Sequence, residues 1–287
     1  MHSITASFKP DSSGTGPKQL GYIPNLKLND GNEIPLFGYG LGSARSRDEA
    51  EKTMQVTVTA INNGYYHLDG AQSYKNETEL GAAIKKSGVD RSKLFVTTKL
   101  QNMNKDVPAA FAASLERLGL DYVDLYLIHA PFGASSPEHL QQTWAALEAI
   151  QRRAAHGPSG CPTSSCRTLR RTSPTGSWPS AARARSRRGV RPADRRAQGA
   201  PGPCDDAYAE LAAKYGVSEA DVALRWCIDQ GIVAITTSAS EQRLKGYMNR
   251  LPAFKLTPKE IERIAEEGKK KHYRGYWLRN FAEDDRR

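Results

Sequence analysis

Long apolar runs are missing from this chain. No stretch approaches the roughly 20 consecutive apolar residues that a membrane-spanning helix needs, although 39% of the 287 residues are hydrophobic. The N-terminus also lacks a cationic start followed by an apolar run, which is the pattern of a secretory signal. We therefore expect a globular cytoplasmic protein with no membrane partner.

The segment 152–204 has few of the residues that build a hydrophobic core. It holds one valine and one leucine, and it has no isoleucine, phenylalanine, tyrosine or lysine. Twelve arginines and a single acid give it a net charge of +11, so the other 234 residues carry −1 of the chain's +10. Such a stretch cannot bury enough apolar area to offset its ordering entropy, so we expect it to carry no structure.

Cysteine is also scarce outside this segment. Three of the four cysteines lie in residues 152–204, and the rest of the chain has only Cys227, as suits a reducing compartment. His156, Cys161 and Cys166 match no common zinc spacing, so we expect no metal site.

Three interpretations of segment 152–204 stay open. It is a flexible basic linker, an arginine-rich arm that binds nucleic acid, or the translation of a GC-rich coding strand in a wrong frame. The third fits best, because out-of-frame GC-rich codons yield Arg, Ala, Pro, Gly and Ser while both flanks keep their regular pattern. We therefore do not expect nucleic acid as a partner.

Outside the segment, short β-rich runs alternate with amphipathic helical runs, the pattern of βα units on a parallel sheet. A hairpin over 26–28 and 33–35 with an Asp-Gly turn comes first. The expected strands are 36–41, 65–69, 94–99, 123–129 and 232–237. The expected helices are 47–62, 77–86, 107–118, 138–151, 206–215, 218–230, 241–249 and 258–268. Pairs that could form capping boxes are Ser46 with Glu49, Asn76 with Glu79, Ser218 with Asp221, and Thr257 with Glu260.

Acid–base side chains stand at the carboxyl ends of three successive strands. Asp69, Lys99 and His129 end the second, third and fourth strands, and Tyr74 lies in the loop after Asp69. Each alone has an ordinary structural role: a helix cap, a solvated lysine, a core histidine. Because the ends of parallel strands meet on one face, the four together form an acid–base set in which a tyrosine delivers a proton.

Four motifs carry a resemblance to a known family. Residues 67–77 read HLDGAQSYKNE, residues 97–99 read TTK, residues 127–129 read LIH, and residues 236–238 read TTS with Arg243 five positions later. In this order they resemble the aldo-keto reductases, most closely the fungal carbonyl reductases. The resemblance covers about 27–151 and 203–287.

The resemblance implies an α/β fold, a (β/α)8 TIM barrel capped by the N-terminal hairpin. It also implies NADPH-dependent reduction of aldehydes or ketones, small-molecule carbonyl substrates. Tyr74 would be the general acid, Lys99 and Asp69 would tune its acidity, and His129 would orient the carbonyl. Ser238 and Arg243 would hold the 2′-phosphate of the cofactor, with Asp69 also in its site.

Three departures accompany the resemblance. Thr237 stands where the family usually has a lysine, and Ala44 and Ala130 replace pocket aromatics. The family draws its fifth, sixth and seventh strands, with the residues that hold the nicotinamide, from the region of segment 152–204. We therefore expect an incomplete barrel, and an inactive or mis-translated remnant stays an alternative to an active reductase, beside the nucleic-acid-binding scaffold.

For domain organisation, residues 1–24 are expected to form a flexible N-terminus. Residues 25–287 are expected to form one aldo-keto reductase barrel domain, interrupted by 152–204. We expect a monomer or a homodimer.

Overall fold

A computed structural model describes residues 22–28, 30–42, 49–104, 106–155, 165–169, 202–271 and 280–281, with the backbone alone at 153–155 and 165–169. Most of the expected flexible N-terminus, 1–24, lies outside these residues. The chain divides into two compact units. We call residues 27–179 and 235–244 the sheet unit, and residues 1–26, 180–234 and 245–287 the helical unit. No described helix combines the length and apolarity needed to cross a membrane.

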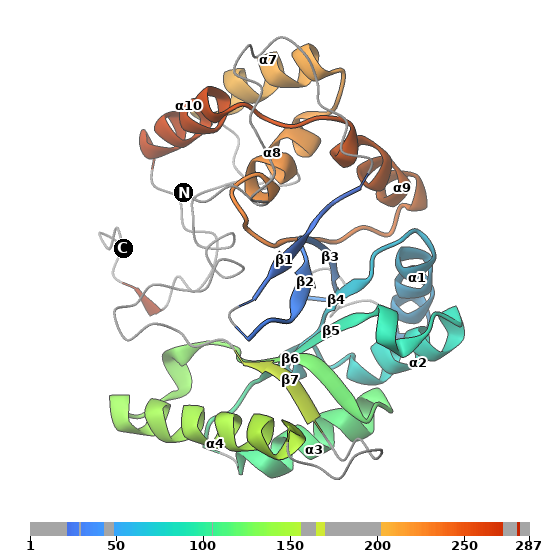
Figure 1. Ribbon diagram of the computed structural model, residues 1–287, viewed down its shortest axis with the longest axis vertical. Helices are drawn as coiled ribbons and strands as arrows, with labels where there is room; N and C mark the ends of the chain where they lie inside the picture. The colour runs from blue at the N-terminus through green and yellow to red at the C-terminus, as the bar shows by residue number, and fades with distance from the viewer. Residues whose placement is uncertain are drawn as a thin grey trace. The chain divides into compact units, whose positions relative to one another are not determined.

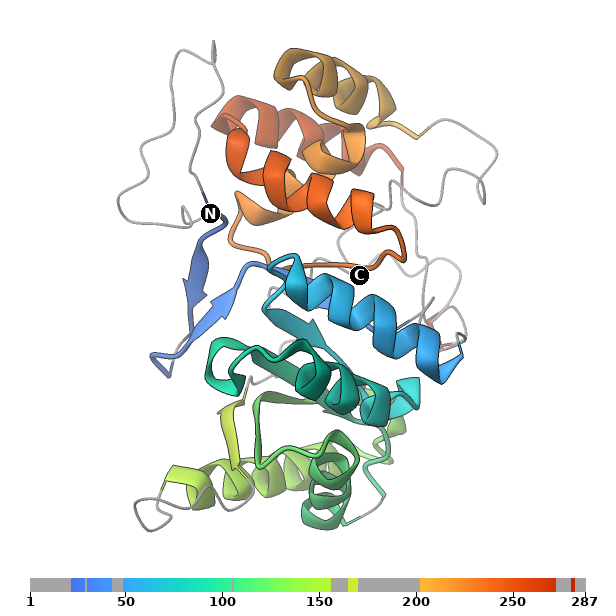
Figure 2. The same cartoon turned by 90° about the vertical axis from the view of Figure 1, so that its right-hand side faces the viewer.

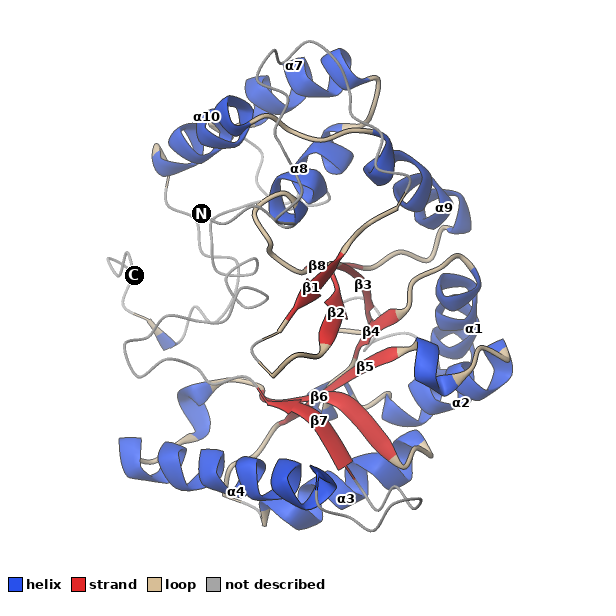
Figure 3. Ribbon diagram, viewed as in Figure 1, coloured by secondary structure: helices blue, strands red, loops and turns tan. Residues whose placement is uncertain are grey.

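A six-stranded sheet forms the centre of the sheet unit (Figure 3). Its order is β7-β6-β5-β4-β3-β8, and β3 to β7 pair in parallel. The strands are β3 (Phe37–Gly40), β4 (His67–Asp69), β5 (Phe95–Leu100), β6 (Tyr122–Ile128), β7 (Ser165–Leu169) and β8 (Ala234–Thr236). Among the described strands of this sheet, β8, the last in sequence, therefore lies beside β3, the first, as it does where a barrel closes.

Helices follow the strands in turn along one side of the sheet (Figure 1). They are α1 (Ala50–Asn62), α2 (Glu77–Ser87), α3 (Val107–Leu118) and α4 (Pro137–Ala155), and each contacts the next. Figure 2 shows α1 and α2 in front of the sheet, one above the other. Gly81 permits the close approach of α2 and α3, because a Cβ there would lie 2.0 Å from the Leu118 carbonyl oxygen. Within the described part of the sheet unit, helices α1 to α4 lie on one side, which is typical of a TIM barrel and not of a doubly wound sheet.

The hairpin and most element boundaries are confirmed. β1 (Asn25–Lys27) pairs with β2 (Glu33–Pro35), and Gly31 takes the positive φ of +88° that the turn requires. The helix predicted at 107–118 is found with those bounds.

One expectation for segment 152–204 is wrong. β7 lies inside the segment and pairs in parallel with β6, from Tyr122 opposite Ser165 to Tyr126 opposite Leu169. Helix α4 also runs on to Ala155. Strand pairing satisfies backbone N–H and C=O groups whatever the side chains are. A stretch poor in core residues can therefore still form a strand on the edge of β6. The rest of the segment up to residue 201 lies outside the described residues.

The capping box predicted for Asn76 with Glu79 does not form. Asn76 caps α2 without a side-chain bond. Its amide nitrogen donates to the Leu41 carbonyl oxygen, 3.0 Å away, and its Oδ1, the atom that would accept from a helix N–H, has no hydrogen-bond partner among the described residues. Helix α1 begins at Ala50 and not at residue 47, with Glu49 at its N-cap and no side-chain bond. Ser46 lies outside the described residues.

Four helices make up most of the described helical unit. They are α7 (Asp205–Tyr215), α8 (Glu219–Ile228), the later part of α9 (Glu241–Arg250) and α10 (Pro258–Lys269), with α7 packed on α8 and α10. The capping boxes of Ser218 with Asp221 and of Thr257 with Glu260 are both present, as predicted. Local sequence signals therefore mark where α8 and α10 begin.

A buried histidine makes the stability of the sheet unit depend on pH. His67 packs edge-on against Phe95, and its Nε2 lies 3.1 Å from the Thr97 hydroxyl. Burial lowers the pKa of His67 to about 4, against the opposing charge of Asp69. Between pH 6.5 and 4 the unfolded chain therefore binds a proton that the folded chain does not, so the folded state loses stability as the pH falls through this range.

We expect this effect to reach roughly 3 kcal/mol by pH 4. Urea unfolding at several pH values should show the wild-type protein losing about that much more free energy of unfolding than the His67→Phe variant. Equal losses in the two proteins between pH 7 and pH 4 would contradict the assignment.

Candidate active site

Strand register brings the acid–base residues together at the carboxyl ends of β4, β5 and β6. Asp69 lies opposite Thr97, and Lys99 follows two residues later on the same face of β5. Lys99 lies opposite Leu127, and His129 follows two residues later on the same face beyond β6. The backbone N–H of His129 donates to the Leu100 carbonyl oxygen at 3.0 Å, which extends the pairing.

The site contains a buried ion pair between Lys99 and Asp69. The Lys99 ammonium lies 2.7 Å from Asp69 Oδ1, and only 7% of each side chain is exposed. The ammonium also donates to the Gly70 carbonyl oxygen at 2.6 Å. These two contacts hold the charge of Lys99 at a fixed point, because a buried cation that lost its anion would bear the full cost of desolvation.

The half-buried Tyr74 lies above this pair. It ends the short 3₁₀ helix η2 (Gln72–Tyr74), and Lys75 after it adopts a left-handed conformation, with φ of 56°. The Lys99 ammonium is 5.0 Å from the centroid of the Tyr74 ring. The absence of a Cβ at Gly42 makes room for that ring, since an added Cβ would lie 2.7 Å from Tyr74 Cζ.

His129 completes the group. Its ring meets the Tyr74 ring edge to face, with centroids 5.5 Å apart and an interplanar angle of 85°. The His129 ring nitrogen Nδ1 lies 2.9 Å from the Ser73 hydroxyl. The structure thus brings Asp69, Tyr74, Lys99 and His129 together, and their arrangement suits proton delivery beside a buried cation.

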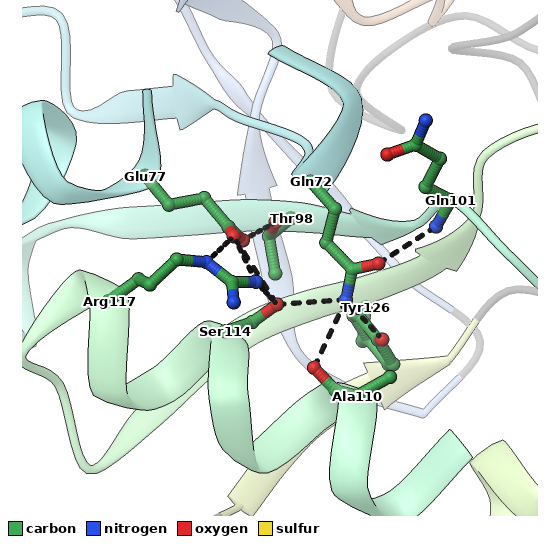
Figure 4. A network of polar contacts seen from close by, with 8 residues as sticks. All are labelled: Gln72, Glu77, Thr98, Gln101, Ala110, Ser114, Arg117 and Tyr126. Carbon is green, nitrogen blue, oxygen red and sulfur yellow. Dashed lines mark hydrogen bonds and ion pairs between the residues drawn. The ribbon is translucent and has the colours of Figure 1, made fainter. Parts of the chain in front are cut away.

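A polar network around Gln72 and Glu77 has no counterpart in the sequence motifs (Figure 4). The Gln72 amide donates to the Ala110 carbonyl oxygen and to the Ser114 hydroxyl, at 3.1 and 2.9 Å. Its carbonyl oxygen accepts from the Gln101 backbone N–H at 3.0 Å. One side chain therefore ties the loop to α3 and to the end of β5.

The network continues to the buried carboxylate of Glu77. This group accepts from the Thr98 hydroxyl at 2.6 Å and lies 2.7 Å from an Arg117 nitrogen. The partners come from β5 and α3, far away in sequence, so periodicity and spacing gave no signal for them. Glu77 is matched in the sequence only as part of the motif at 67–77.

Ser238 and Arg243 lie in a separate place, around the start of α9. Tyr39 of β3, fully buried, donates to the Ser238 carbonyl oxygen at 3.1 Å, and the Ser238 hydroxyl accepts from the Ser240 N–H at 3.0 Å. The Arg243 N–H lies 3.3 Å from the Ser240 hydroxyl, while the Arg243 side chain is exposed. A helix start with an exposed guanidinium is a suitable place for an anion.

The family model described as "Aldo/keto reductase family" matches residues 37–156 and 180–268. This chain belongs to the aldo-keto reductase family. The second match begins at residue 180, inside segment 152–204, where the sequence motifs indicated no resemblance.

Known aldo-keto reductases match most of the chain. The NAD/NADP-dependent indole-3-acetaldehyde reductase of Schizosaccharomyces pombe is 29% identical over 273 residues, 86% of this chain and 96% of that one. An aldo-keto reductase of Bombyx mori is 32% identical over 282 residues, 84% of this chain and 91% of that one. A crystal structure of the Bombyx mori enzyme in complex with NADP has a TM-score of 0.65 and 29% identity, covering 88% of this chain and 94% of that one.

These relatives establish that the chain is an NAD(P)-dependent oxidoreductase of carbonyl compounds with the α/β fold of its family. The residues present fit a nicotinamide dinucleotide at two places. Ser238 and Arg243 offer an anion site at α9, and the acid–base group lies where the sheet presents its carboxyl ends.

Proposed function

We propose that this aldo-keto reductase reduces aldehydes and ketones to alcohols with NADPH, and that Tyr74 is its general acid. The observation that carries the proposal is the buried Lys99 ammonium, which lies 2.7 Å from Asp69 Oδ1 and 5.0 Å from the centroid of the Tyr74 ring. A fixed cation beside a phenol favours the phenolate that remains once the proton has left.

NADPH, when bound, supplies the hydride that adds to the carbonyl carbon. The negative charge that develops on the carbonyl oxygen then requires a proton, and the Tyr74 hydroxyl donates it. Lys99 stabilises the resulting phenolate through charge, and Asp69 holds Lys99 in place. His129, edge to face with Tyr74, orients the carbonyl oxygen by hydrogen bonding.

Two features support NADPH as the cofactor. The exposed Arg243 guanidinium can bind a 2′-phosphate in a bidentate manner, and Ser238 lies in the loop just before α9, the helix that carries Arg243. Thr237 supplies no charge there, so most of the preference for NADPH over NADH would come from Arg243. Arg243→Ala should therefore raise the Kd for NADPH more than the Kd for NADH.

The substrate we propose is an aromatic or α-keto aldehyde. Ala130, just beyond the end of β6, leaves more room than an aromatic residue would, and the relative from Schizosaccharomyces pombe is named for indole-3-acetaldehyde.

We propose the cytoplasm as the location of the protein. The two described cysteines, Cys204 and Cys227, are both free thiols, as suits a reducing compartment.

Steady-state oxidation of NADPH by the purified full-length chain tests the function, with indole-3-acetaldehyde and phenylglyoxal as substrates. We expect saturable turnover with at least one of them. Quenching of protein fluorescence by NADPH, measured separately, reports cofactor binding. Cofactor binding without turnover would refute carbonyl reduction, and the absence of both would favour the inactive remnant.

A further inference from the structure

The serine before the proposed acid makes a contact that the reaction scheme leaves unused. Ser73 Oγ lies 2.9 Å from Nδ1 of His129, 56 residues away in sequence. Both side chains are half-buried, and Tyr74 immediately follows Ser73 in η2. The contact therefore joins the loop of the acid to the end of β6, where the carbonyl is oriented.

We propose that Ser73 is a positioning residue that fixes the tautomer and orientation of His129. The inference rests on the proposed function, because it assigns to His129 the task of donating a hydrogen bond to a carbonyl oxygen. Such an oxygen only accepts, so the ring must carry its proton on Nε2. Nδ1 must then accept, and the Ser73 hydroxyl is the group placed to donate to it.

The position of Ser73 is itself fixed by its neighbour. Gln72 uses both ends of its amide, donating to Ala110 and Ser114 of α3 and accepting from the Gln101 N–H (Figure 4). The backbone of η2 thus cannot shift without breaking bonds to two other elements. The hydroxyl of Ser73 keeps its distance from His129 for the same reason, so the ring is oriented before a substrate arrives.

A hydrogen bond donated in the other direction, from His129 to Ser73, would prevent His129 from binding a carbonyl oxygen. If Nδ1–H of His129 donated to Ser73 Oγ, Nε2 would be an acceptor and would repel a carbonyl oxygen. The two polarities therefore differ in which ring nitrogen carries the proton, and this can be measured without cofactor or substrate.

Threonine and valine at position 73 form a matched pair, because they have nearly the same shape and only threonine keeps the hydroxyl. We expect Ser73→Val to lower kcat about tenfold with little change in KM, the effect of one ordinary hydrogen bond. Ser73→Thr should restore most of kcat. Equal kcat values for Ser73→Val and Ser73→Thr would overturn the proposal.

Nitrogen-15 NMR of the ring gives a second readout, independent of turnover. Long-range proton–nitrogen correlations distinguish the two tautomers, and the His129→Gln variant identifies the signals of His129. At a pH where the ring is neutral, we expect the Nε2–H form in the wild-type protein and in Ser73→Thr, and a mixture of tautomers in Ser73→Val. An Nδ1–H form in the wild-type protein would overturn the proposal.

The two readouts separate this inference from the proposed function. A wild-type protein without turnover would refute the function, whatever the tautomer of His129. A wild-type protein with turnover whose tautomer and kcat do not respond to the hydroxyl at position 73 would refute the role of Ser73 alone.

Discussion

Replacing Tyr74 with phenylalanine is expected to lower kcat for carbonyl reduction by about 10²–10⁴-fold, the usual contribution of a general acid. The variant loses one oxygen and keeps the ring that lies 5.0 Å from Lys99 and edge to face with His129. The packing of the site is therefore kept, and the loss falls on proton delivery. Steady-state kinetics with NADPH and phenylglyoxal measure it.

A matched control is the Tyr215→Phe variant. Tyr215 donates its hydroxyl to Glu260 at 2.8 Å in the helical unit and has no part in the proposed site. We expect its kcat to stay within twofold of the wild-type value. NADPH should quench the fluorescence of the wild-type protein and both variants at similar concentrations. A Tyr74→Phe variant with more than half of the wild-type kcat would exclude Tyr74 as the acid.

Replacing Arg225 with methionine is expected to lower the free energy of unfolding by about 3–5 kcal/mol. Arg225 is fully buried in α8 and donates to Asp229 through Nε and Nη2, at 2.9 and 2.7 Å, and to the Leu251 carbonyl oxygen at 2.8 Å. The variant leaves the Asp229 carboxylate buried with a weaker set of partners, Lys255 at 3.9 Å and the Leu256 N–H.

Arg263→Met provides the comparison on the surface. Arg263 pairs with Glu210, but the side chains are 44% and 60% exposed. Water can therefore solvate the Glu210 carboxylate once the arginine is removed. We expect a loss below about 1 kcal/mol for this variant. Urea unfolding followed by circular dichroism measures both, and similar losses in the two variants would show that the Arg225 cluster does not hold the helical unit together.

Much of the fold could be predicted from local signals. Hydrophobic periodicity places the strands and helices outside segment 152–204 within a few residues of where they lie, and the Ser218 and Thr257 boxes begin their helices as expected. These signals act over three or four residues and need no tertiary contact. Asn76 is different, because its side chain is oriented by a distant carbonyl group, that of Leu41, which accepts from its amide nitrogen, and its Oδ1 caps no helix N–H.

β7 could not be predicted for a related reason. Its residues form almost no apolar pattern, and its place is set by backbone pairing with β6. Amino-acid composition indicates how much apolar side-chain area a segment can bury, but it carries no information on backbone pairing. Segment 152–204 therefore contributes a strand that its composition argues against.

The acid–base residues can be predicted from sequence because they stand at the carboxyl ends of strands, where parallel strands converge. Motifs at Asp69, Lys99 and His129 mark three successive strands. Asp69 and Lys99 are in contact, and the His129 ring meets that of Tyr74. The supporting contacts carry no such mark. Ser73 with His129, and Gln72 with Ser114, join residues 56 and 42 positions apart, and only the folded chain pairs them.

Transfer of deuterium from the cofactor tests the central claim most directly. The full-length chain is incubated with phenylglyoxal and NADPH that carries deuterium at both C4 positions, and the product is analysed by mass spectrometry. We predict an alcohol with one deuterium on the former carbonyl carbon, and only traces of it with Tyr74→Phe. An alcohol without deuterium, or none from a protein that binds NADPH, would contradict the assignment of this chain as a working carbonyl reductase.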